Sequence, residues 1–266
     1  MSSSHGFWSL GGFIGGSAGA WVIAHWGSEV QSLLTAGVVA MVVLAAMPFL
    51  LPETAHSPVA EAVAAPKTKL FPKDFHIWLL GFLALFSMVP EGAVLDWAAI
   101  YLQKELGSDV FVSGLAFAFF AGAMAVMRFL GDTVRNRFGA VRTLRISGLL
   151  GAAGLMGGAL APWDWVAIIS FAAAGLGVAN MVPILFSAAG NHPRLPSASA
   201  ISIVTMVGYC GILVAPSTIG FLAEHAGFRP TYAGLALILV VVALLAARAA
   251  DADGRKVVPV LPGQPA

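Results

Sequence analysis

Eight long apolar stretches, separated by short polar gaps, make up most of this chain of 266 residues. Each is close to the roughly 20 residues that an α-helix needs to cross a hydrocarbon layer. A membrane β-barrel would instead show segments of about ten residues with alternating polarity, whereas these stretches are continuous. The pattern therefore predicts an all-α fold, a polytopic membrane helix bundle of eight transmembrane helices. These cover residues 7–26, 30–51, 75–101, 110–130, 141–161, 166–189, 201–223 and 231–250.

The composition agrees with a membrane protein. Hydrophobic residues make up 59% of the chain and charged residues 10%, and the mean hydropathy is +0.88. Such a chain has too little polar surface to cover a water-soluble globule. We therefore expect the lipid bilayer to surround these helices.

The basic residues are distributed very unevenly between the two sides of the implied topology. Of the 14 Lys and Arg, only Lys104 and Arg229 fall on one side. The positive-inside rule places the other side in the cytoplasm, which predicts a multi-pass protein of the cell inner (plasma) membrane with both termini cytoplasmic. Because the basic residues lie in short loops at helix ends, no nucleic-acid partner is expected.

Polar segments divide the chain into four parts. Residues 1–51 hold two spans, and residues 52–74 form a linker rich in Pro, Lys and Glu that we expect to be cytoplasmic. Residues 75–250 hold six spans. Residues 251–266 are polar and rich in Pro, which predicts a disordered cytoplasmic tail.

Glu91 is the leading functional candidate, because it lies near the middle of the third span. An ionised side chain at that depth costs about 2.5–3.5 kcal/mol on insertion scales, so a partner or a proton must compensate it. The adjacent Pro90 removes a backbone donor and favours a kink beside the acid. The alternative is a protonated Glu91 that only hydrogen-bonds to another helix.

Further polar side chains within the spans are candidates for binding or coupling. Asp96 lies roughly 140° around the helix from Glu91, so the two carboxylates are expected to act separately, with Trp97 and Asp96 near the outer interface. Asn180 with Pro183 combines an amide with a second helix break at mid-depth. Tyr209 in the seventh span and Ser9 in the first complete the set.

The first span is dense in glycine, which predicts a smooth helix face that a neighbouring backbone can approach closely. The glycines of this stripe are Gly11, Gly12, Gly15, Gly16 and Gly19.

The polar gap after the fourth span combines glycines, an acid and several arginines. Its charges could form only a positive-inside stop, or they could hold one conformation through charge-assisted bonds that break in another. The candidate gating residues are Arg128, Gly131, Asp132, Arg135, Arg137, Gly139 and Arg142.

This gap resembles the cytoplasmic signature between the second and third helices of each half in the major facilitator superfamily of secondary transporters. Where the first-half signature places an acid before its Arg-x-Gly, this chain has Asn136. A gating salt bridge would therefore have to use Asp132.

Several further stretches look similar to the bacterial MosC-like branch of this superfamily, which is associated with rhizopine metabolism and lies near the fucose-type sugar symporters. The resemblance implies two six-helix halves around a central cavity that opens alternately to either side. In that register the eight spans correspond to helices five to twelve. We expect an N-terminally truncated chain whose missing N-terminal helices are required for transport. The similar stretches are residues 5–12, 91–97, 180–190 and 208–209.

These observations favour a secondary active transporter of a small polar solute, sugar-like or polyol-like, with Glu91 as the proton-coupling group of a symporter. An efflux carrier for drugs or metabolites and a non-transporting membrane scaffold are the alternatives. An enzyme is not expected, because the histidines lack metal-ligand spacing and no nucleophile motif occurs. No cofactor and no metal are expected.

Overall fold

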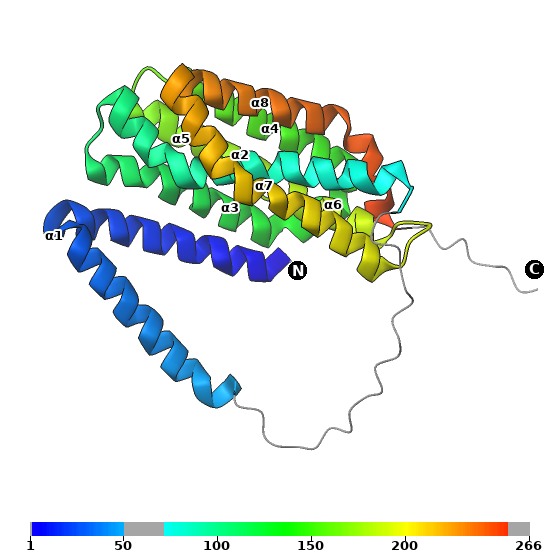
Figure 1. Ribbon diagram of the computed structural model, residues 1–266, viewed down its shortest axis with the longest axis horizontal. Coiled ribbons are helices and arrows are strands. Elements are labelled where there is room, and N and C mark those ends of the chain that lie inside the picture. Colours follow the sequence, from blue (N-terminus) through cyan, green and yellow to red (C-terminus); the bar gives the residue numbers. More distant parts are fainter. Residues whose placement is uncertain (1, 51–71, 255–266) are drawn as a thin grey trace, which may run out of the picture.

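The computed structural model describes residues 2–50 and 72–254, and every regular element within these ranges is a helix. The prediction of an all-α fold is confirmed. The elements, shown in Figure 1, are α1 (Ser2–Leu50), α2 (Phe75–Leu106), α3 (Val110–Phe138), α4 (Ala140–Ala159), α5 (Asp164–Val178), α6 (Met181–Gly190), α7 (Ser197–Ala226), α8 (Phe228–Leu244) and the 3-10 helix η1 (Ala246–Asp253). The predicted linker lies almost entirely outside the described residues.

Two expected spans are joined in α1, which changes direction at Gly27. This residue has φ 87° and ψ 165°, a left-handed conformation that glycine adopts without steric cost. The first arm, residues 2–26, packs along α3, while the second arm, residues 28–50, points away from the bundle (Figure 1). The side chains of the second arm are mostly exposed, Leu33 and Leu44 among them.

Within the described residues, five helical stretches are long and apolar enough to cross a membrane. Both arms of α1 count as one of these stretches. The pair α8 and η1, bent by 53°, would make a sixth. The predicted span 141–161 is not among them, because Arg142 and Arg145 in the first two turns of α4 lower its mean hydropathy. It nevertheless packs against α5 and α8 along its buried face.

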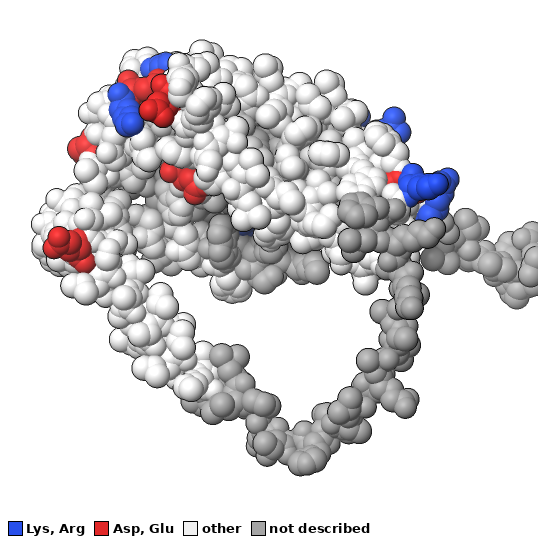
Figure 2. Space-filling view, viewed as in Figure 1, with Lys and Arg blue, Asp and Glu red and all other residues white. Residues whose placement is uncertain are grey.

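Charged side chains on the face shown in Figure 2 lie mostly at the two ends of the bundle, with a wide, largely uncharged band between them. We call the end where α3 meets α4 and where α6 meets α7 the arginine-rich end. Its described arginines include Arg135, Arg137, Arg142, Arg194 and Arg248.

The glycine stripe of the first span packs on one side only. A Cβ on Gly16 would overlap the ring of Phe117 in α3, lying 2.7 Å from its Cε1 atom, and one on Gly12 would lie 3.4 Å from the Cβ of Ala121. Nothing lies within 4 Å of the corresponding positions on Gly11 and Gly15. The predicted packing helix is therefore confirmed for the Gly12 and Gly16 face, while the other face is open.

The sixth predicted span is broken in the middle, as the sequence indicated. Helix α5 ends at Val178 and α6 begins at Met181, with Asn180 between them. Pro183 lies in the first turn of α6. Backbone N–H groups in the first turn have no acceptor within the helix, so a proline there costs no helical hydrogen bond. By contrast, α2 remains a continuous helix through Pro90.

Two polar segments are more ordered than the sequence suggested. Helix α3 continues to Phe138, so most of the expected loop after the fourth span is helical and the chain turns at Gly139, with φ 78°. The prediction of a disordered tail from residue 251 is wrong for its first residues, because η1 extends to Asp253 and buries Ala252. Residues 255–266 lie outside the described part.

Candidate functional site

Three helices bring polar side chains together around the guanidinium of Arg128. From α3, Arg128 Nη2 donates to Glu91 Oε1 of α2 at 3.0 Å, and Nη1 donates to Ser9 Oγ of α1. Its Nε donates to the carbonyl oxygen of Ala179, at the break between α5 and α6, at 3.4 Å. The site thus connects four segments that are far apart in the sequence.

The Arg128 and Glu91 side chains form a buried ion pair, with 7% and 14% of their surfaces exposed. Removing both charges from water is costly, and close geometry together with extra hydrogen bonds must offset that cost. Here the Ser9 hydroxyl and the Ala179 carbonyl supply the extra bonds to the guanidinium. Glu91 is thus bonded to a basic side chain of another helix, α3.

Glu91 and Arg128 open onto a cavity of about 390 Å³, which we call the middle cavity. Tyr209 of α7 also lines it and has 49% of its surface exposed. The remaining walls are apolar side chains of α2, α6 and α7. The complete lining is Met88, Glu91, Arg128, Val182, Pro183, Phe186, Tyr209 and Ile212.

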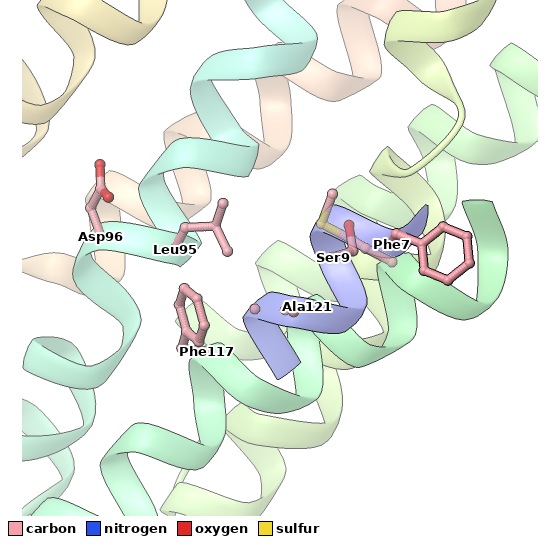
Figure 3. Close-up of a pocket in the computed structure, with 9 residues that line it drawn as sticks. Phe7, Ser9, Leu95, Asp96, Phe117 and Ala121 are labelled. Carbon is pink, nitrogen blue, oxygen red and sulfur yellow. The ribbon is translucent and has the colours of Figure 1, made fainter. Parts of the chain in front are cut away.

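A second cavity, of about 520 Å³, lies between the first arm of α1 and helices α2 and α3. Figure 3 shows Ser9 of α1 and Leu95 and Asp96 of α2 around it, with the Asp96 carboxylate pointing away from the ring of Phe117. Ser9 therefore lines this cavity while accepting a hydrogen bond from a side chain of the middle cavity. Glu91 and Asp96 line different cavities.

Trp97 and Asn180, two further candidates, pack between helices. The Trp97 ring lies 2.7 Å from where a Cβ on Gly220 of α7 would be. Asn180 is buried, and its Nδ2 donates to the carbonyl oxygen of Met127 at 3.5 Å. Its Cγ lies 3.0 Å from where a Cβ on Gly131 would be. The structure thus places the Asn180 amide between the α5–α6 break and α3, away from the middle cavity.

The arginine-rich end contains a third cavity, of about 290 Å³, which we call the end cavity. In its wall, Arg135 Nη2 donates to Ser187 Oγ at 2.8 Å and to the carbonyl oxygen of Ala252. Asn191 Nδ2 donates to the same carbonyl at 3.4 Å. The complete lining is Asp132, Arg135, Val182, Pro183, Phe186, Ser187, Gly190, Asn191, Ser197 and Ile201.

The other candidate gating residues lie around this end without joining that network. Asp132 is exposed, and in the described ranges it forms no ion pair. Arg137 lies over the ring of Phe138 at 5.8 Å, and Arg142 is exposed. An acid that binds the backbone here is Asp253, whose Oδ1 accepts from the backbone N–H of Ala140 at 2.8 Å.

Two histidines, His76 at the start of α2 and His192 in the loop before α7, lie with their ring centres 5.5 Å apart. The ring of His192 is buried, and its Nδ1 accepts from the backbone N–H of Arg194, which requires an unprotonated Nδ1. Burial lowers the pKa of His192, and the nearby positive groups of His76 and Arg194 lower it further, against the opposing effect of Asp74 and Asp251. Its Nε2 lies 3.6 Å from Asp74 Oδ2. In the described ranges, no group of three or more His, Cys, Asp or Glu is placed to hold a metal ion.

Sequence reasoning did not single out the partners of Arg135. Ser187 and Asn191 follow Pro183 at steps of four residues, which places all three on one face of a helix. This spacing could have indicated that the two side chains lie together. The sequence gives no such indication for Ala252, because Ala252 acts through its backbone carbonyl.

Comparisons with known proteins agree on one family. The sequence profile of the Major Facilitator Superfamily matches residues 1–197. An uncharacterized MFS-type transporter of Yersinia pestis is 32% identical over 246 residues, covering 91% of this chain and 62% of the relative. An uncharacterized transporter of Sinorhizobium fredii is 31% identical over 253 residues, covering 92% of this chain and 64% of the relative. The membrane protein MosC of Rhizobium meliloti is 31% identical over 169 residues, covering 64% of this chain and 40% of that protein.

The fold is also similar to that of a solved peptide transporter of the POT type in complex with alafosfalin. The TM-score is 0.56 at 20% sequence identity, over 71% of this chain and 41% of the other. This chain spans less than two thirds of the length of the first two relatives. From the profile match and the relatives, this multi-pass membrane chain belongs to the major facilitator superfamily.

Proposed function

We propose that the chain acts in secondary active transport of a small polar solute, sugar-like or polyol-like, by alternating access and with a proton as the coupled ion. The observation that carries this proposal is the buried Glu91–Arg128 pair opening onto the middle cavity. Membership of the transporter superfamily and the relatives named as transporters support it. On this proposal the arginine-rich end faces the cytoplasm and the membrane is the inner membrane.

Competition for the two charges would couple proton and solute. While Glu91 is ionised, its carboxylate occupies Arg128. A proton on Glu91 neutralises the counter-charge of Arg128. The guanidinium keeps its bonds to Ser9 and Ala179, but a further acceptor then becomes favourable, because a buried charge without a counter-charge is expensive. A hydroxyl-rich solute in the middle cavity offers such acceptors. Proton uptake therefore favours solute binding, which is the thermodynamic requirement for symport.

The pH dependence of solute binding tests this coupling directly. We expect hexoses and polyols, titrated against the purified chain, to reveal a ligand whose affinity rises by up to about tenfold for each unit of pH decrease. Glu91→Gln imitates the protonated acid, so its affinity should be high and independent of pH. Isothermal titration calorimetry in buffers of different ionisation enthalpy measures both the affinity and the proton uptake.

Glu224→Gln is the matched control, since Glu224 is an exposed acid near the end of α7. Its affinity should keep the pH dependence of the unmodified chain. If Glu91→Gln also kept it, the coupling assignment would be wrong. If no solute of either class bound, the result would favour a membrane scaffold over a carrier.

A further inference from the structure

We infer that Phe186, with Val182 and Pro183, forms a barrier between the middle cavity and the end cavity, so that the two cavities are consecutive chambers of one path. This inference rests on the proposed transport function. Its basis is that these three residues of α6 line both cavities.

The exposure pattern of α6 orients the barrier. Met181, Ile184, Leu185, Ala188 and Ala189 are buried in the bundle. Val182, Pro183, Phe186, Ser187 and Gly190 are only partly buried and lie on the opposite face. This second face follows the spacing of one side of a helix. Both cavities therefore lie against the same face of α6, one after the other along its axis.

The chemistry changes from polar to apolar and back to polar along this face. The middle cavity presents Glu91, Arg128 and Tyr209, and the end cavity presents Arg135 and Ser187 among its polar groups. The three residues that line both cavities have hydrocarbon side chains. A polar solute that passes from one chamber to the other must give up its hydrogen bonds at this wall and regain them beyond it, which makes the wall a kinetic barrier.

Phe186 is the part of the wall that can move without unfolding α6. Rotation about two side-chain bonds displaces its ring while the backbone stays in place. The next residue, Ser187, is held by Arg135 and donates to the carbonyl oxygen of Ala252 at 3.3 Å. This anchoring fixes the helix position from which the ring swings.

Access of a charged thiol reagent to the middle cavity tests the barrier without requiring transport. Cys210 is first replaced by serine, and Met88→Cys then reports on the middle cavity, while Ser197→Cys in a second protein reports on the end cavity. A membrane-impermeant methanethiosulfonate reagent is added to the cytoplasmic face of inside-out vesicles. Because the labelling rate follows the fraction of time that the barrier is open, Phe186→Ala should raise the rate at position 88 about tenfold and leave the rate at position 197 unchanged.

Two further variants guard against misfolding and nonspecific effects. Phe186→Trp enlarges the ring and should lower the rate at position 88. Phe221→Ala removes a phenyl group from α7 that is 61% exposed and lines neither cavity, so it should change neither rate.

Unchanged labelling at position 88 in both Phe186 variants, with position 197 still reactive, would overturn the barrier. Labelling that follows the expected pattern in a chain whose Glu91→Gln variant keeps pH-dependent binding would support the barrier and contradict the proton coupling. The failures of the two proposals are thus distinguishable.

Discussion

At the scale of single residues, Arg128 shows how one side chain can hold several helices together. Its guanidinium has five donors in a fixed planar arrangement, and they reach an acid, a hydroxyl and a backbone carbonyl on three other segments. Sequence reasoning placed Arg128 with the gating arginines at the helix end. Its burial sets it apart from Arg137 and Arg142, which are exposed.

His192 is the residue for which a pH effect on stability follows from the structure. Because burial lowers its pKa from the ordinary value near 6.5, the unfolded chain binds a proton more readily than the folded chain. The contribution of His192 to the free energy of unfolding is therefore fully present above about pH 6.5, and it is lost as the pH decreases toward the lower pKa of the folded state. We expect the melting temperature of the purified chain to fall between about pH 7.5 and pH 5.5, measured by the intrinsic fluorescence of its tryptophans.

His192→Gln serves as the comparison for this effect, since glutamine does not titrate. Its melting temperature should depend less on pH over the same interval. An equally steep decrease in this variant would assign the effect to other groups.

At the scale of elements, close contacts between glycines set how tightly the helices pack. Helices α4 and α5 approach so closely that a Cβ on Gly177 would lie 2.6 Å from the Cα of Gly151 and 2.7 Å from the carbonyl oxygen of Ser147. Both neighbours are backbone atoms, so neither can rotate away. Glycine at these positions is a packing requirement, as expected for helices in a membrane.

Gly177→Ala should therefore destabilise the chain by about 1–3 kcal/mol, the usual range for overpacking. Reversible unfolding in mixed detergent micelles, followed by circular dichroism, measures the change. Gly234→Ala in α8 is the control, because nothing lies within 4 Å of its added Cβ. Equal stabilities of the two variants would mean that α4 and α5 can separate at little cost.

The elements that the sequence predicted well are those with a simple hydrophobic signal. Long apolar stretches identified the helices, and the Asn180 and Pro183 pair identified the break between α5 and α6. Gly131 was read as a turn residue, yet it lies within α3. Glycine is required there because the Asn180 side chain occupies the space that a Cβ would need. A contact between segments about 50 residues apart cannot be read from local sequence.

The candidate site, too, could be predicted from the sequence only in part. Glu91 stands out in the sequence because an acid at mid-depth needs a partner, but nothing local indicates that the partner is Arg128 with Ser9. In η1, Ala246, Ala249 and Ala252 are buried, but alanine also occupies the exposed positions 247 and 250. The local sequence therefore gives no signal for the buried side of this helix.

At the scale of the whole molecule, η1 fastens the arginine-rich end. The carbonyl oxygen of Ala252 accepts from Arg135, Ser187 and Asn191, and Asp253 accepts from the first backbone N–H of α4. These contacts tie the end of the described chain to α3, α4 and α6. Through Ser187, they connect the residue next to the proposed Phe186 barrier to a short C-terminal segment.

Asp253→Ala should loosen this end while the rest of the bundle remains folded. Loss of a capping carboxylate costs about 1 kcal/mol, so amide hydrogen exchange in η1 and in the first turn of α4 should accelerate by about fivefold. Mass spectrometry of peptides from the labelled chain locates the change. Asp132→Ala removes an exposed acid from the same end and should leave these amides unaffected; identical exchange in the two variants would contradict the role of Asp253.

The pairing of Glu91 with Arg128 also has an electrical consequence. An ionised carboxylate and a guanidinium 3.0 Å apart have no net charge together, so a rearrangement that carries both across part of the bilayer does no work against the membrane potential. Once Glu91 holds a proton, the same rearrangement carries one positive charge, worth about 2.3 kcal/mol per 100 mV for a complete crossing. If the chain works as proposed, voltage would therefore drive this rearrangement in the protonated form and leave the unprotonated form unaffected.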